Sequence, residues 1–119
     1  MRENIVMVKA YAFALRIVKA YKFLYQDQHE FVMSKQLLRS GTAIGALIKE
    51  SEHAQSKADF INKMNVALKE ANETEYWLML LHDSDFMNDN VFTSIITDCR
   101  EIVRLLISIV RSSKENNIR

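Results

Sequence analysis

The sequence predicts an all-α protein, an antiparallel up-and-down bundle of four helices. The chain of 119 residues has no proline and only two glycines, although the tight turns of sheets depend on glycine, proline and asparagine. Apolar residues make up 49% and charged residues 26%, which is typical of a globular domain. Helical spacing of the apolar residues predicts one domain over residues 1–119, with helices at about 4–26, 35–53, 57–82 and 89–114.

The first predicted helix, residues 4–26, is apolar on more than one side. One stripe at helical spacing consists of Val6, Ala10, Phe13, Ile17, Tyr21 and Leu24. Ile5, Val8, Leu15 and Phe23 fall on another side, between the charged residues. One apolar face can enter the bundle, but the second must be buried elsewhere. The helix therefore predicts an oligomer.

The second helix is expected to start after Ser34, because serine is a favourable N-cap, and to end near His53. Gly41 and Gly45 are four residues apart and share one face of it. Glycine inside a helix costs up to about 1 kcal/mol relative to alanine. Two glycines in a chain that otherwise avoids glycine therefore indicate tight packing or a close contact with another backbone.

The third and fourth helices each carry a seam with alternating spacings of four and three residues, as in a coiled coil. The Ser56 hydroxyl is expected to accept a hydrogen bond from the Asp59 N–H and so to cap the third helix. The third seam consists of Phe60, Met64, Ala67, Ala71, Thr74, Leu78 and Leu81. Cys99 lies on the fourth seam, and the polar tail after Lys114 is expected to fray.

Catalytic and metal-binding residues are not predicted. A di-iron site in a four-helix bundle needs two Glu-x-x-His pairs, and Glu50 with His53 supplies only one. Cys99 is expected to be a core residue and not a nucleophile. One cysteine favours a reducing compartment. The N-terminal segment, interrupted by charges, is neither a signal peptide nor a membrane span, so we expect a cytoplasmic protein without cofactors.

Two glutamates of the third helix share a face and need a cation. Glu70 and Glu73 are three residues apart. An arginine of a neighbouring helix, for example Arg39, is the expected partner, in an ion pair that fixes helix register within one subunit or between two. Trp77 is expected to be a core or interface anchor.

Positive charge is concentrated in the first half of the chain. Residues 1–49 hold eight Lys or Arg against three Asp or Glu, a net of +5, and residues 50–119 hold eight against twelve, a net of −4. Arg2, Lys9 and Arg16 are spaced by seven residues and so line up along one side of the first helix, and this basic stripe can contact phosphates. It can equally be a solvated face, or pair with the acidic half of a neighbouring subunit. The candidate nucleic-acid-binding residues are Arg2, Lys9, Arg16, Lys19, Lys22 and Lys35.

Residues 34–81 resemble a bacterial family of four-helix bundle proteins, the 23S rRNA-intervening sequence proteins. The segments that carry the resemblance are 36–42, 44–46, 56–60, 67–71 and 73–78. Their motif residues are Arg39, Gly41, Gly45, Ser56, Asp59, Glu70, Glu73 and Trp77. The chain departs from the family pattern at Leu47, where a polar residue is more usual, and at Ser51, where glycine is more usual.

The resemblance implies an antiparallel four-helix bundle that is a subunit of a homopentamer, and it transfers no catalytic residue. A related branch, the accessory variability proteins of diversity-generating retroelements, forms basic pentamers that bind nucleic acid and a reverse transcriptase. This chain has a net charge of only +1. Two functions follow: a non-enzymatic oligomeric accessory or scaffold protein that binds RNA or DNA, or a purely structural module that binds protein. An enzyme or metalloprotein built on Glu50 and His53 is the least favoured.

Overall fold

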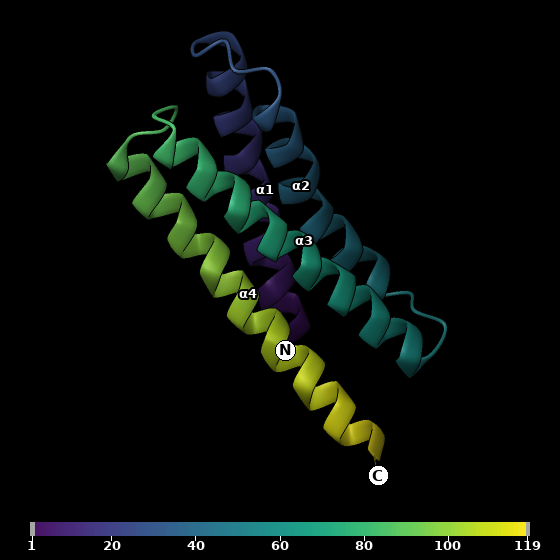
Figure 1. The fold of residues 1–119 in the computed structure, drawn as a ribbon. Helices are drawn as coiled ribbons and strands as arrows, with labels where there is room; N and C mark the ends of the chain where they lie inside the picture. Colours follow the sequence, from purple (N-terminus) through teal and green to yellow (C-terminus); the bar gives the residue numbers. More distant parts are fainter. Residues whose placement is uncertain (1, 119) are drawn as a thin grey trace.

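The structure is a computed structural model that describes the backbone of residues 2–118 and the side chains of residues 5–115. The described residues form four α-helices and no strand. Consecutive helices run in opposite directions (Figure 1). Each helix contacts two others, and α1 and α3 lie on a diagonal without contact. The helices are α1 (Arg2–Gln26), α2 (Met33–Ser51), α3 (Lys57–Asp83) and α4 (Asp89–Ile118). The predicted all-α, four-helix fold is confirmed.

The start of α2 differs from the prediction. The helix begins at Met33, and Ser34 lies buried within its first turn instead of capping it. The cap is the side chain of Glu30, whose carboxylate accepts hydrogen bonds from the backbone N–H groups of Val32, Met33 and Ser34 at 3.1, 3.1 and 2.6 Å. A carboxylate satisfies these free N–H groups and favours the positive end of the helix dipole. The prediction that Ser34 is the N-cap is therefore wrong.

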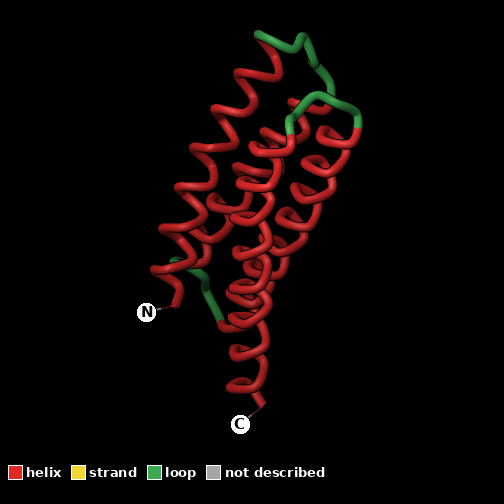
Figure 2. The backbone as a smooth tube through the Cα atoms, turned by 90° about the vertical axis from the view of Figure 1, so that its left-hand side faces the viewer, coloured by secondary structure: helices red, strands yellow, loops and turns green. Residues whose placement is uncertain are grey.

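The C-terminal end of α4 also differs from the prediction. The helix continues to Ile118 instead of fraying after Lys114. The tail lacks glycine and proline, the residues that most often end a helix. This last part of α4 projects beyond the ends of the other helices (Figures 1 and 2).

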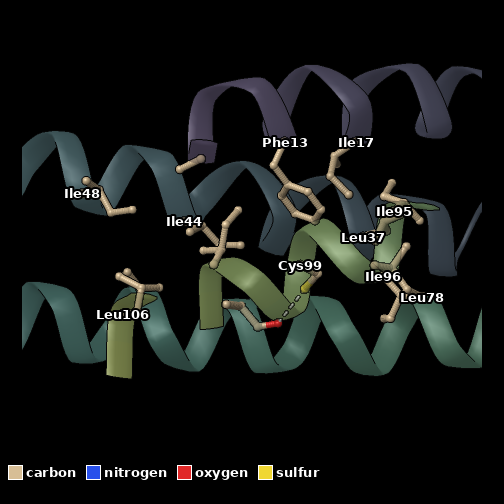
Figure 3. Close-up of a cluster of buried hydrophobic side chains, with 14 of the residues drawn as sticks. Phe13, Ile17, Leu37, Ile44, Ile48, Leu78, Ile95, Ile96, Cys99 and Leu106 are labelled. Atoms are coloured by element: carbon tan, nitrogen blue, oxygen red, sulfur yellow. Dashed lines mark hydrogen bonds between the residues drawn. The ribbon is translucent and has the colours of Figure 1, made fainter. Parts of the chain in front are cut away.

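The core runs along the axis of the bundle and takes side chains from all four helices (Figure 3). Complete burial of one such side chain contributes about 1.5–3 kcal/mol. The largest fully buried side chains are Phe13, Ile17, Leu24, Leu37, Ile44, Ile48, Met64, Leu78, Leu81, Ile95, Ile102 and Leu106. Among the described residues, the buried side-chain nitrogen and oxygen atoms all have hydrogen-bond partners. The Thr74 hydroxyl, for instance, donates to the Ser40 hydroxyl at 2.9 Å. None of the described helices combines the length and the apolar character that a membrane crossing requires.

The glycine face of α2 packs against α1, and the predicted tight packing is found at Gly41 but not at Gly45. A Cβ atom added to Gly41 would lie 2.8 Å from both Cγ atoms of Ile17, closer than real contacts allow. A Cβ added to Gly45 would lie 3.7 Å from the Cβ and carbonyl oxygen of Ala10, an ordinary van der Waals distance. The two glycines therefore differ in how strictly the packing requires them.

We expect opposite effects of alanine at these two positions. Gly41→Ala should lower the free energy of unfolding by about 1–2 kcal/mol, since overpacking Ile17 outweighs the gain in helix propensity. Gly45→Ala should be neutral or stabilising by up to about 1 kcal/mol, because the added methyl group fits. Urea unfolding at one fixed protein concentration measures both. A Gly41→Ala variant as stable as the wild type would contradict the packing argument.

Candidate nucleic-acid interface

Two of the predicted phosphate contacts on α1 face α4 and are already paired. The Lys9 ammonium lies 3.3 Å from the Glu101 carboxylate. The Arg16 guanidinium lies 2.6 Å from the Asp98 carboxylate and also donates to the Ser94 hydroxyl at 2.9 Å. The two cations are seven residues apart and therefore lie on the same side of α1, which is the side that packs against α4. Binding a phosphate at either cation would require breaking an ion pair.

The cations at the C-terminal end of α1 are different. Lys19 and Lys22 are exposed and form no ion pair with any described side chain. The Lys35 ammonium lies 5.9 Å from the centre of the Tyr25 ring, in a cation–π contact. The side chain of Arg2 lies outside the described residues. Among the described cations of α1, Lys19 and Lys22 are therefore the predicted contacts that no ion pair occupies.

A groove of about 1150 Å³ lies next to these lysines, between α1 and the connection from α3 to α4. Arg16, Lys19 and Phe23 form part of its α1 side, and Asp83 and Asp89 belong to its other side. Acids opposite the lysine weaken its attraction for an anion. The groove itself is thus of mixed charge and is not a preformed anion site.

His82 in this groove was not singled out by the sequence. Its Nδ1 and Nε2 atoms lie 2.9 and 2.7 Å from carboxylate oxygens of Asp83 and Asp89. The hydrogen bond with Asp89, followed by that with Asp83, raises the pKa of His82 above its ordinary value. The imidazole also stacks on Phe92, with ring centres 4.2 Å apart. The protonated side chain therefore ties the end of α3 to the start of α4.

The arginine partner predicted for Glu70 and Glu73 is confirmed, and it lies within one subunit. Arg39 of α2 donates to Glu70 at 3.2 Å and forms a second short ion pair with Glu73. The Trp77 indole N–H donates to the same Glu73 carboxylate at 3.0 Å. The hydrogen bonds from Trp77 and then Arg39 hold the pKa of Glu73 below its ordinary value. The network sets the register of α2 against α3.

The remaining motif residues also have local structural roles. The Asp59 N–H donates to the Ser56 hydroxyl at 3.0 Å, which confirms the predicted cap of α3. The Asp59 carboxylate in turn accepts from the Gln55 N–H at 3.1 Å. Together with the glycines and the Arg39 network, the cap shows that the motif positions hold helices in place.

The residues tested for metal or thiol chemistry lie apart from one another. The Glu50 carboxylate lies 3.8 Å from the Lys63 ammonium, and His53 is exposed beyond the end of α2. Among the described side chains, no three His, Cys, Asp or Glu are grouped closely enough to hold a metal ion. Cys99 is fully buried (Figure 3), and burial raises the pKa of its thiol to about 12. It is a core residue that carries no thiolate at neutral pH.

An apolar surface lies on the outer side of α1, away from the core. We name this surface the α1 outer face. It consists of four large side chains, Ile5, Val8, Tyr11 and Leu15, which are 49%, 68%, 63% and 57% exposed. A shallow groove of about 660 Å³ between α1 and α2 adjoins it. On the diagonal helix α3, Tyr76 is 58% exposed and Met79 42%. The bundle thus presents apolar surface on two opposite sides.

These features define a four-helix bundle protein with structural motif residues and apolar outer surfaces. The model of the family described as 23S rRNA-intervening sequence protein matches residues 2–108, and the chain belongs to this family. A protein with unknown function from the S23 ribosomal protein family of Bacteroides thetaiotaomicron has a crystal structure similar to this one. The two share 59% identity and a TM-score of 0.92, covering 93% of this chain and 99% of that one. Among curated proteins none matches.

The His82 contacts predict a pH-dependent contribution to stability. Because the pKa of His82 is raised in the folded state, its contribution is fully present below the unfolded pKa of about 6.5 and is lost as pH rises through the folded pKa. The difference in Tm between wild type and His82→Gln should therefore be largest near pH 5.5 and shrink towards pH 9. His53→Gln is the matched control, since the exposed His53 side chain has no polar contact among the described residues. A difference for His82→Gln that is constant with pH would refute this role.

Proposed function

We propose that the protein is a non-enzymatic, cytoplasmic accessory or scaffold protein that acts as a homo-oligomer, and that the oligomer binds nucleic acid. The observation that carries the oligomer is the α1 outer face. Four large apolar side chains about half exposed or more on one helix are unusual for a monomer and typical of an interface. The family resemblance favours a pentamer.

The positions of the apolar surfaces support a ring. In a two-fold dimer one surface patch meets its own copy, whereas two different patches on opposite sides of a subunit build head-to-tail contacts that can close into a ring. The α1 outer face and the Tyr76–Met79 surface of α3 are two such patches, on diagonal helices. The α1 outer face of one subunit would then pack against α3 of the next. Such a ring would also repeat any basic surface several times, so that weak sites act together.

Light scattering after size exclusion tests the oligomer. We expect a mass several times that of the 13.9 kDa chain, with five copies favoured. Val8→Asp should convert the oligomer to monomers, because a carboxylate would be buried without a partner. Val32→Asp is the matched control, since Val32 is 73% and Val8 68% exposed but only Val8 lies on the α1 outer face. A wild-type monomer at micromolar concentration would end the proposal.

Nucleic-acid binding is supported by the exposed cations that form no ion pair with a described side chain, beginning with Lys19 and Lys22. We expect binding of RNA or DNA at about 50 mM salt that weakens steeply as salt increases, because phosphate contacts release counterions. Lys19→Gln with Lys22→Gln should weaken binding about tenfold, measured by fluorescence anisotropy. Lys57→Gln with Lys69→Gln changes charge equally on α3 and should leave it within about twofold. No binding at low salt would contradict the nucleic-acid function.

The alternative is a purely structural protein–protein module. One observation favours it: Lys9 and Arg16, two of the predicted phosphate contacts, are held in ion pairs with α4. An oligomer without nucleic-acid binding at low salt would select this alternative. A monomeric wild-type protein would exclude the proposed ring, both for the nucleic-acid-binding function and for the protein–protein module.

A further inference from the structure

The outer side of α4 carries a line of cations that the basic stripe of α1 does not include. The four residues recur at spacings of four, seven and three, which places them on one side of the helix. All four are exposed. We name this set the α4 basic row: Arg100, Arg104, Arg111 and Lys114.

Little negative charge opposes this row. The two acids that flank it within α4, Asp98 and Glu101, are engaged by Arg16 and Lys9 of α1. Within the row, Arg100 lies 3.2 Å from the Glu75 carboxylate. The other three cations form no ion pair with a described side chain, and Glu115 is the one acid that follows at the end of the row. The α1–α4 ion pairs therefore neutralise Asp98 and Glu101, and Arg104, Arg111 and Lys114 are the cations of the row that no described acid pairs with.

The row is long and accessible. It spans about 21 Å along the helix axis, and its two cation pairs, Arg100 with Arg104 and Arg111 with Lys114, are centred about 16 Å apart. Its C-terminal pair lies near the C-terminal end of α4, and this end projects beyond the other helices (Figures 1 and 2). The opposite side of α4 is buried in the core through Ile102, Leu106 and neighbours, so the helix has no apolar face to insert into a lipid surface.

We propose that the α4 basic row binds the sugar–phosphate backbone of duplex DNA, with one cation pair on each strand beside the major groove. The separation of the pairs exceeds the groove width of about 12 Å, as contact with both flanking strands requires. Guanidinium groups bind phosphate oxygens in pairs of hydrogen bonds, and three of the four cations are arginines. The row contains no aromatic side chain on which single-stranded bases could stack. This inference rests on the proposed nucleic-acid function and names its surface and its ligand.

Fluorescence anisotropy with a 5′-labelled DNA duplex of about 20 base pairs and arbitrary sequence tests the proposal. Arg104→Gln with Arg111→Gln removes one cation from each pair and leaves the α1–α4 ion pairs intact. We expect at least about tenfold weaker binding at 50 mM salt. The slope of log affinity against log salt should fall by about 1 for each cation removed. Lys57→Gln with Lys69→Gln removes the same charge from α3 and should leave both values unchanged, and circular dichroism checks that all variants keep their helices.

Each outcome decides. Weaker DNA binding by the variant with Arg104→Gln and Arg111→Gln supports the row, whether or not the variant with Lys19→Gln and Lys22→Gln also binds more weakly. Loss only with the Lys19 and Lys22 variant overturns the row but leaves the proposed function standing. Tighter binding of an RNA duplex, whose major groove is deep and narrow, or of single strands overturns the DNA assignment. A wild-type protein that binds none of these probes at 50 mM salt overturns both the row and the nucleic-acid function.

Discussion

The close approach of α1 and α2 is the constraint on which the other features depend. Gly41 has no side chain, so Ile17 of α1 can lie directly on the backbone of α2. Gly45 lies four residues further along α2 and faces Ala10, where the packing is looser and a methyl group would fit. Each glycine costs up to about 1 kcal/mol in helix propensity, and burial of Ile17 alone, worth about 1.5–3 kcal/mol, offsets much of that cost. The chain has only two glycines, and one of them, Gly41, stands where the packing leaves no room for a side chain.

The fixed position of α1 determines what its other sides do. With one side against α2, the side bearing Lys9 and Arg16 meets α4, where ion pairs close the seam. The outward side, including Val8 and Leu15, is left exposed. One helix therefore supplies a core face, a polar seam and an apolar outer face. The apolar residues of α1 are thus divided between the core and the outer face. A helix that is apolar nearly all round can therefore occur here, although no described helix is long and apolar enough to cross a membrane.

Periodicity predicted the helices and most of the core, because burial imposes spacing directly on sequence. The Ser56 cap and the Arg39 network were also predictable, since they join residue types with strong mutual preference at suitable positions. The Glu30 cap was not, because glutamate is an unusual cap and reaches the helix only through the shape of the preceding turn. His82 meets Asp89 across a loop that sequence patterns do not place. The spacing of Lys9 and Arg16 aligned them but did not say which neighbour they face.

The distribution of charge over the surface follows from the same packing. A net charge of +1 argues against binding a polyanion only if positive and negative groups are evenly mixed. A phosphate responds to charges within about one Debye length, near 10 Å at 0.1 M salt. In this fold Lys9 and Arg16 of α1 neutralise Asp98 and Glu101. These two acids therefore no longer offset the cations on the outer side of α4. The local field at Arg104 and Arg111 is therefore set by a pairing that total charge does not reveal.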